Sequence, residues 1–304
     1  MSAISSYIRD LDCELQDSRS MKDYTTFKIG GDADAVVHVR SGEALRTLLS
    51  RLTADGLPHL LIGCGSNLLV ADEGIRGVVI RFDSKCAEIE RIGETTLRCD
   101  AGVPLAKLSR VAQQAGLSGL EFACGIPGSM GGGLYMNAGA YGGEMVQVVR
   151  TADVLFPDGE IRTVEADSLS LSYRHSALME NGGVVLSATF ALTESDPERI
   201  KQTVTELLTA RREKQPLEYP SAGSFFKRPT GYFAGKLIDD CGLRGYRVGD
   251  AQVSEKHAGF VINRGDATCD QVRQLEKDVR TRVFEQFGVT MSPEVRLLGT
   301  RWFE

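Results

Sequence analysis

Two glycine-rich stretches have the residue types and spacing needed to hold an anion. The first, residues 63–70, reads Gly-Cys-Gly-Ser-Asn-Leu-Leu-Val and follows a short apolar run. It begins Gly63-x-Gly65, as a dinucleotide-binding fingerprint does, but Leu68 occupies the third glycine position and no long amphipathic helix follows. A Rossmann domain is therefore disfavoured. The stretch is either a plain turn between strands or a phosphate-binding loop of another fold.

The second stretch, residues 125–143, contains eight glycines interleaved with Ile126, Leu134, Met136 and Asn137. A flexible linker lacks such apolar anchors. We interpret the stretch as a series of tight turns whose backbone N–H groups converge on one cavity, because such nests bind pyrophosphate without basic side chains. A structural crossover without a ligand is the alternative. Two such loops favour a dinucleotide over a simple phosphate.

Hydrophobic periodicity predicts the elements that position these loops. A strand at 34–39, a helix from the cap Ser41 to Gly56 and a strand at 60–62 form a β-α-β unit ahead of the first loop. Between the loops we expect strands at 77–82, 87–92 and 95–99 and a helix at 104–115.

The second half of the chain is predicted in the same way. Strands at 151–156 and 160–164 are joined by the turn Pro157-Asp158-Gly159. We also expect strands at 184–192, 259–263 and 294–298, and helices at 234–241 and at 270–287. Another helix opens at Ser195-Asp-Pro and carries Ile200, Val204, Leu207 and Leu208 on one side, and a charged stretch ending at Pro216 follows it. The capping box Thr268-x-x-Gln271 introduces the last helix.

The length of 304 residues suggests about two domains. We place an N-terminal segment at 1–20, a domain at 21–195 with lobes at about 21–82 and 83–195, and a final domain at 196–304.

Composition excludes several classes of protein. A net charge of −6 gives no overall field for nucleic acid or anionic membranes. The seven cysteines are odd in number and lack any C-x-x-C, so neither a disulfide framework nor a zinc site is predicted, and we assign no metal. No apolar run is long enough for a signal peptide or a membrane span. These features favour a cytoplasmic protein.

Several ordered motifs together resemble those of the UDP-N-acetylenolpyruvoylglucosamine reductase family, from about residue 20 to the end of the chain. They are Tyr24-Thr-Thr-Phe-Lys-Ile-Gly-Gly31, Gly63-Cys-Gly-Ser-Asn-Leu-Leu69, Gly125-Ile-Pro-Gly-Ser-x-Gly-Gly132, Asn137-Ala-Gly-Ala-Tyr141, Ser172-Tyr-Arg174, Ala222-Gly-Ser-Phe-Phe-Lys227 and Pro293-Glu-Val295. The short stretch between Arg174 and Ser224, without an inserted lid, is similar to the compact subclass of this family.

The resemblance implies an α+β fold with a two-lobed FAD-binding domain of the vanillyl-alcohol-oxidase type and a C-terminal α+β substrate-binding domain. It implies FAD and NADPH as cofactors, and reduction of the enolpyruvyl ether of UDP-N-acetylglucosamine-enolpyruvate to UDP-N-acetylmuramate in peptidoglycan precursor synthesis. NADPH and this small-molecule substrate would occupy one cleft in turn, and no obligate protein partner is inferred.

The resemblance also implies roles for individual residues. It implies that Arg174, Ser224 and Glu294 are catalytic and that Lys214, Tyr219 and Lys227 bind the substrate. The FAD contacts would come from Gly63, Cys64, Gly65, Ser66, Asn67, Leu68, Gly125, Ile126, Pro127, Gly128, Ser129, Gly131, Gly132, Asn137, Gly139 and Ala140. Lys28, Arg40 and Tyr141 are left as ligand-lining candidates without assigned tasks.

The implied reaction requires particular side chains. Hydride addition to a vinyl ether carbon leaves negative charge that spreads into the attached carboxylate, so the site needs fixed positive charge there. Arg174 is suited to this because a guanidinium is a planar fork that stays charged, and Glu294 would orient it or share a donor. Ser224 would give the proton that completes the reduction, provided that its hydroxyl is held in place.

Two rival functions remain open at this point. A flavin oxidase of the same fold would pass electrons to oxygen, and a nucleotide-sugar-binding module would lack catalysis altogether. A serine hydrolase is excluded because the chain has no Gly-x-Ser-x-Gly motif.

Overall fold

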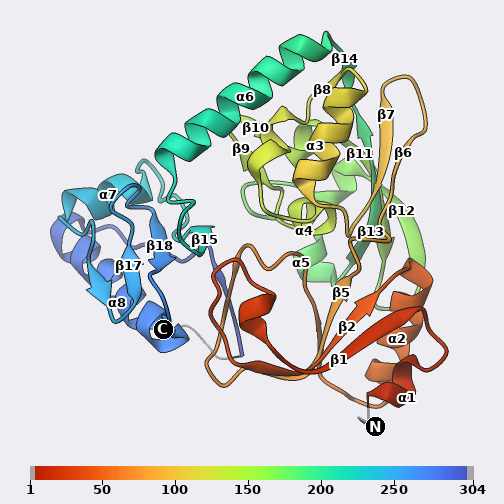
Figure 1. Cartoon of the computed structure of the whole chain (residues 1–304), viewed down its shortest axis with the longest axis horizontal. Coiled ribbons are helices and arrows are strands. Elements are labelled where there is room, and N and C mark those ends of the chain that lie inside the picture. The colour runs from red at the N-terminus through yellow and green to blue at the C-terminus, as the bar shows by residue number, and fades with distance from the viewer. Residues whose placement is uncertain (1–3, 300–304) are drawn as a thin grey trace. The chain divides into compact units, whose positions relative to one another are not determined.

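The computed structural model describes residues 4–299 (Figure 1). Contacts divide this part of the chain into two compact units, each built from three separate segments. The first unit takes the described residues of Met1–Gln16, Val36–Cys64 and Val79–Arg211, and the second those of Asp17–Ala35, Gly65–Val78 and Arg212–Glu304. The boundaries expected near residues 21, 83 and 196 stay a prediction.

An antiparallel sheet forms the centre of the first unit, in the strand order β12-β11-β13-β7-β6. Its strands are β6 (Ile89–Arg91), β7 (Thr96–Asp100), β11 (Val149–Leu155), β12 (Ile161–Glu165) and β13 (Val184–Ala191). Gly159 closes the hairpin between β11 and β12 at a φ of +83°, which a glycine adopts without strain. The expected turn at residues 157–159 is thereby confirmed.

Most helices of the first unit bury apolar side chains. The helices are α1 (Ser5–Ile8), α2 (Gly42–Ala54), α3 (Leu105–Gln114), α4 (Met130–Tyr135), α5 (Leu178–Asn181) and α6 (Pro197–Lys214), whose last three residues belong to the second unit. Short 3₁₀ turns are η2 (Glu121–Gly125), η3 (Met145–Gln147) and η4 (Ala166–Leu169), and two-residue strands are β8 (Leu117–Ser118), β9 (Gly139–Ala140), β10 (Gly143–Glu144) and β14 (Thr193–Glu194). Leu105 and Leu108 of α3 pack with Leu97 and Phe190 of the sheet in one buried cluster.

A further sheet has the strand order β1-β2-β5-β3. Its strands are β1 (Cys13–Ser20), β2 (Asp32–Val39), β3 (His59–Leu61) and β5 (Ile75–Phe82). The division between the two units falls within β1, β2 and β5. The expected β-α-β unit is made of β2, α2 and β3. Strand β5 lies between β2 and β3 in the sheet, so the two strands of the unit are not direct neighbours.

The second unit combines residues from both ends of the chain. Its antiparallel sheet has the order β15-β18-β17-β16, made of β15 (Ser221–Ser224), β16 (Arg247–Val248), β17 (Ala251–Val253) and β18 (Phe260–Asn263). Helix α8 (Cys269–Phe287) lies against β16 and β17, and α7 (Ala234–Asp240) lies against α8. Strand β19 (Arg296–Leu298) pairs in parallel with β4 (Leu68–Val70), and η1 (Met21–Asp23) precedes them in the chain.

The core of the second unit explains why these segments associate. Phe27, Ile29 and Leu69 are fully buried in one cluster with Val272 and Val279 of α8. Burying a side chain of this size contributes about 1.5–3 kcal/mol. The N-terminal residues are therefore part of the same core as the C-terminal residues.

Most predicted elements are confirmed within one or two residues, including the caps. The Ser41 hydroxyl accepts a hydrogen bond from the amide of Ala44 at 3.1 Å, and the Thr268–Gln271 capping box is formed. The expectation that residues 125–143 are built from turns alone is wrong, because 130–135 form α4. Strand β1 was not predicted. No helix within residues 4–299 has the length and apolar run needed to cross a membrane.

Candidate functional site

Gly63, which begins the first glycine-rich loop, lies next to the second loop in the first unit. A Cβ added to Gly63 would lie 2.6 Å from the Ser129 hydroxyl oxygen, which is closer than real Cβ contacts allow. The same hydroxyl accepts a hydrogen bond from the amide of Gly132 at 3.3 Å and so caps α4. Gly63 and Ser129, both predicted from sequence, are thus brought together.

Backbone donors of the first loop are available to a ligand. Within the described residues, the amides of residues 63–67 donate no hydrogen bond inside the chain. Gly65 has a φ of +66°, and a Cβ there would lie 2.0 Å from the Tyr24 carbonyl oxygen. Consecutive free amides around a left-handed residue form an anion-binding nest.

The second loop offers fewer donors than the sequence suggested. The amides of Met130, Gly131 and Gly133 donate to the carbonyls of Val103, Ala101 and Ser129. A Cβ on Gly131 would lie 2.8 Å from that of Ala101, so this glycine allows α4 to pack closely instead of shaping a nest. Among the described residues, the amides of Gly128 and Ser129 donate to no group of the chain.

These two sets of amides fit the pyrophosphate of a dinucleotide such as FAD. Within the first unit, the free N–H groups of Gly63, Cys64, Gly128 and Ser129 border the point where Gly63 and Ser129 meet. Burial raises the pKa of the Cys64 thiol, so this cysteine is held in its neutral form beside the cradle. The cradle therefore supplies dipoles without a competing negative charge.

The remaining predicted FAD contacts have other neighbours in this structure. A Cβ on Gly125 would lie 2.8 Å from Cδ of Arg211, and Gly139 and Ala140 form the strand β9 that pairs with β10. In the second unit, Leu68 begins strand β4. Contacts of these residues with FAD stay a prediction, as they do for Ser66, Ile126 and Pro127.

Arg174 sits at the tip of a tight turn in the first unit. Ser172 and His175 exchange two backbone hydrogen bonds, each of 3.1 Å, which close the turn around Tyr173 and Arg174. Arg174 has a φ of +54°, a conformation that costs a non-glycine residue of order 1–3 kcal/mol. Its guanidinium carbon lies 5.3 Å from the Tyr173 ring centroid.

Asn137 is fully occupied by contacts inside the first unit. Its amide nitrogen donates to Glu144 Oε2 at 2.8 Å and to the Ser172 carbonyl at 3.1 Å, and its oxygen accepts from the Val146 amide at 3.0 Å. The side chain is 1% exposed. The Asn137 side chain thus connects the second loop with the Arg174 turn, and its expected contact with FAD stays a prediction.

Ser224 lies at the end of strand β15 in the second unit. Its neighbour Gly223 has a φ of +79°, and the pairing of β15 with β18 shifts register between Ser221 and Ser224. Phe225 is buried and its amide donates to the Gly259 carbonyl at 2.8 Å. Such a bulge re-aims a side chain, and Ser224 is exposed here.

Glu294 lies beside the Ser224 segment and the end of the first loop. The Glu294 amide donates to the Phe225 carbonyl at 2.8 Å, and the Lys227 amide donates to the Ser292 carbonyl at 2.9 Å. The Asn67 side chain donates to the Glu294 carbonyl at 3.2 Å, and Asn67 accepts from the Arg296 amide at 2.9 Å. Glu294 is 8% exposed.

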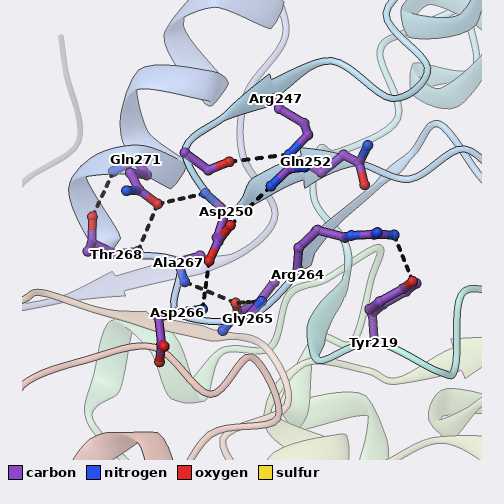
Figure 2. Close-up of polar contacts among 12 residues, drawn as sticks. Tyr219, Arg247, Asp250, Gln252, Arg264, Gly265, Asp266, Ala267, Thr268 and Gln271 are labelled. Atoms are coloured by element: carbon purple, nitrogen blue, oxygen red, sulfur yellow. Dashed lines mark hydrogen bonds and ion pairs between the residues drawn. The ribbon is translucent and has the colours of Figure 1, made fainter.

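Of the predicted substrate residues, Tyr219 borders a cavity of the second unit. Arg264 donates to the Tyr219 hydroxyl at 2.7 Å and its guanidinium carbon lies 4.6 Å from the ring centroid (Figure 2). The cavity of about 210 Å³ is also lined by Lys256 and by Gln252, whose buried Oε1 has no hydrogen-bond partner among the described residues. Lys214 and Lys227 are exposed and do not line it.

The three candidates without assigned tasks have separate surroundings. Arg40 is bound to Asp12 at 3.1 Å and to Asp83 at 3.4 Å, so it is an ion-pair residue. The Lys28 carbonyl accepts from the Asn263 side chain at 3.4 Å, in the second unit. Tyr141 is exposed at a φ of +53°.

Sequence reasoning missed Arg211. This residue is half-buried in the first unit, and burial lowers its pKa while Tyr141 and Cys124 act in the opposite direction. It makes no ion pair with a carboxylate among residues 4–299. A half-buried cation beside the second loop is a candidate for binding an anionic ligand. Because Arg211 belongs to a helix with many charged residues, nothing in the sequence distinguished it from a solvent-exposed arginine.

Comparison with known proteins identifies the family. An FAD-binding-domain profile matches residues 33–165, and the profile of the UDP-N-acetylenolpyruvoylglucosamine reductase C-terminal domain matches residues 215–298. The UDP-N-acetylenolpyruvoylglucosamine reductase of Agathobacter rectalis is 52% identical over 296 residues, covering 94% of each chain. That of Lachnoclostridium phytofermentans is 50% identical over 286 residues, covering 91% of each chain.

A solved structure gives the same result. The crystal structure of UDP-N-acetylenolpyruvylglucosamine reductase from Thermus caldophilus aligns with a TM-score of 0.79 and 36% identity, over 94% of this chain and 98% of that chain. The α+β fold and the FAD-binding domain expected from the sequence are confirmed. The chain therefore belongs to the UDP-N-acetylenolpyruvoylglucosamine reductase family and is an FAD- and NADPH-dependent oxidoreductase of peptidoglycan precursor synthesis.

Proposed function

We propose that this chain reduces the enolpyruvyl ether of UDP-N-acetylglucosamine-enolpyruvate to the lactyl ether of UDP-N-acetylmuramate, in the cytoplasm. The observation that carries the proposal is the meeting of Gly63 and Ser129 beside free backbone amides, in a chain 52% identical to a named reductase. FAD, once reduced by NADPH, supplies the hydride. The protein must hold the cofactor, grip the substrate carboxylate and deliver a proton.

The free amides of the two loops hold the cofactor diphosphate. Backbone N–H groups bind phosphate oxygens at fixed positions and need no counter-charge from a side chain. This suits a chain with a net charge of −6. In the first loop, Asn67 is held by Glu294 and Arg296, so its amide is presented in one orientation.

Arg174 binds the carboxylate of the enolpyruvyl group. A guanidinium makes two parallel hydrogen bonds to a carboxylate, and these strengthen as charge moves into the carboxylate during reduction. The strained φ of +54° supports this role, because such strain persists where the surrounding structure enforces it and concentrates at functional sites.

Ser224 donates the proton that completes the reduction, and Glu294 assists at the carboxylate. A serine hydroxyl is a weak acid, so its contribution depends on being fixed beside a strongly basic carbon. The bulge after Gly223 and the buried Phe225 provide this fixation. The hydrogen bond from Glu294 to the Phe225 carbonyl keeps the two predicted catalytic residues on adjoining segments.

The nucleotide part of the substrate binds through polar groups outside the reacting centre. We assign the nucleoside to the cavity beside Tyr219, where the unpaired Gln252 oxygen would accept an N–H of the base. Lys214 and Lys227 would attract the diphosphate, and Arg211 adds a half-buried positive charge in the first unit.

A visible absorption series tests the proposal. The holoenzyme should show a flavin band that NADPH bleaches and that the enolpyruvyl substrate restores under anaerobic conditions. NADPH and substrate should compete, with inhibition at high substrate concentration. Rapid oxygen consumption without restoration by the substrate would favour an oxidase, and a colourless protein that binds UDP sugars would favour a non-catalytic module.

A further inference from the structure

The left-handed residues Asn137 and Arg174 are joined by a short path of hydrogen bonds. Asn137 donates to the Ser172 carbonyl at 3.1 Å, and the same carbonyl accepts from the His175 amide at 3.1 Å. These two bonds meet at the base of the turn that has Arg174 at its tip. From this arrangement we propose that Asn137, held by Glu144, is a positioning residue that fixes the orientation of the Arg174 turn for the substrate carboxylate.

The hydrogen-bonding partners of Asn137 allow only one orientation of its amide group. The Glu144 carboxylate and the Ser172 carbonyl accept hydrogen bonds, whereas the Val146 amide donates one. Flipping the Asn137 side chain would oppose all three partners. The group is also 1% exposed, so water cannot replace a lost partner without entering the core.

Glu144 anchors this arrangement to a regular element. Its side chain accepts from the Gln147 amide while Gln147 Oε1 accepts from the Glu144 amide at 3.2 Å, which makes the capping box of η3. The Glu144 carboxylate is therefore held in place when Asn137 donates to it at 2.8 Å. Hydrogen bonds to a charged acceptor are stronger than neutral ones. The path runs from η3 through Glu144 and Asn137 to the Arg174 turn.

Backbone conformation gives independent support. Asn137 has a φ of +42°, and asparagine is among the few non-glycine residues that adopt this region readily. Glycine would satisfy the backbone more easily, so an asparagine here indicates a use for its side chain. All of that side chain's hydrogen bonds are made within the first unit, which places its function in holding the turn.

The proposal rests on the role given above to Arg174, and the experiment separates the two. The variants are Asn137→Asp, Arg174→Ala and the double variant, prepared as holoenzymes. Asn137→Asp keeps the side-chain volume and the acceptor for Val146, but the ionised carboxylate cannot donate to Ser172 or Glu144 and is repelled by both. Rates of flavin reduction by NADPH and of flavin reoxidation by substrate are measured separately in stopped flow.

Asn137→Asp should leave flavin content and reduction by NADPH within about threefold and slow reoxidation by substrate about 10- to 100-fold, because small misplacements of a positioned group cost up to about 10²-fold. In the Arg174→Ala background the same substitution should add less than about threefold, since residues acting as one unit are not additive. A merely structural role would lower both half-reactions in both backgrounds.

Two further variants serve as a second route and a control. Glu144→Ala removes the carboxylate that accepts the hydrogen bond from Asn137. It should reproduce the selective slowing of flavin reoxidation if Asn137→Asp does not fold. Ser187→Ala, in strand β13, loses the hydrogen bonds to Asp153 at 2.7 Å and from Arg98 at 2.9 Å but no contact with the turn, and should leave both half-reactions unchanged.

Three results would overturn the proposal. Loss of flavin or slower reduction by NADPH in Asn137→Asp would make Asn137 a cofactor residue. An equal additional loss in the Arg174→Ala background would show that Asn137 does not act through Arg174. If Arg174→Ala itself leaves reoxidation unchanged, the role of Arg174 fails first and that of Asn137 fails with it.

Discussion

The Glu294 amide donates a hydrogen bond to the carbonyl of Phe225 at 2.8 Å. This bond joins the Pro-Glu-Val segment near the end of the chain to the residue that follows Ser224. Because Phe225 is buried and Gly223 is left-handed, the position of Ser224 depends on both neighbours. The two predicted catalytic residues of the second unit are thus part of one local arrangement.

Ser224→Ala should separate the two half-reactions. The substitution removes the proton donor but no contact with the nucleotide cofactors, so reduction by NADPH should stay nearly normal. Reoxidation by substrate should fall by about 10²-fold or more, as expected for loss of a general acid. Stopped-flow absorbance measures both rates. Ser221→Ala on the same strand is the control, and equal losses in both half-reactions would remove Ser224 from this role.

Gly65→Ala should yield a protein that holds flavin poorly. The added Cβ would lie 2.0 Å from the Tyr24 carbonyl oxygen at a φ of +66°, so the loop must shift. We expect the Kd for FAD to rise at least about tenfold, which corresponds to about 1.4 kcal/mol. The flavin-to-protein absorbance ratio after gel filtration measures this.

Gly159→Ala is the matched control for that experiment. Its φ of +83° imposes similar backbone strain, but nothing lies within 4 Å of the added Cβ. It should cost about 1 kcal/mol of stability and leave flavin content unchanged. Normal flavin retention by Gly65→Ala would argue against a rigid first loop.

The ion pair of His175 and Glu180 should stabilise the protein only at lower pH. Its hydrogen bond of 2.7 Å to Glu180 raises the pKa of His175 above its ordinary value of about 6.5. Stability from a raised pKa is fully present below the unfolded value and is lost as pH rises through the folded value. The Tm difference between the native protein and Glu180→Gln should therefore be larger at about pH 5.5 than at about pH 9.

Glu165, an exposed glutamate that forms no ion pair among the described residues, provides the comparison. The Tm difference between the native protein and Glu165→Gln, at the end of β12, should be the same at about pH 5.5 and at about pH 9. A Glu180→Gln difference that grows with pH would show that the pair does not hold a proton on His175.

Thr268→Ala should destabilise the protein by about 1 kcal/mol through loss of a helix cap. The Thr268 hydroxyl accepts from the Gln271 amide at 3.2 Å, and Gln271 Oε1 accepts from the amides of Thr268 and Asp250 (Figure 2). Denaturant unfolding gives the free energy of unfolding. Glu285→Ala, on the exposed face of the same helix, should change it by less than about 0.5 kcal/mol.

Local signals explain why much of the fold was predictable. Ser41, Thr268 and Gly116 each mark a helix end through bonds or dihedral angles that involve only nearby residues. The hairpin at Gly159 is equally local. Helix α4 escaped prediction because glycine has a low helix propensity, and its close packing against Ala101 became visible only in three dimensions.

Long-range contacts explain what the sequence could not reveal about the site. The family resemblance pointed to Asn137, but its contacts with Glu144 and Ser172 became visible only in the structure. Arg211 has no motif of its own and becomes a candidate only because it is half-buried beside Tyr141. Neither relationship follows from residue spacing.

Phe27, Ile29 and Leu69 are made early during synthesis, yet they share a buried cluster with Val272 and Val279 of α8. Strand β4 likewise has no parallel partner strand until β19 has been synthesised. While the ribosome is still translating, these N-terminal apolar side chains have no native neighbours from α8. Folding of the second unit must therefore wait until α8 and β19 have been synthesised, and until then its early apolar segments lack their native partners and are prone to aggregate.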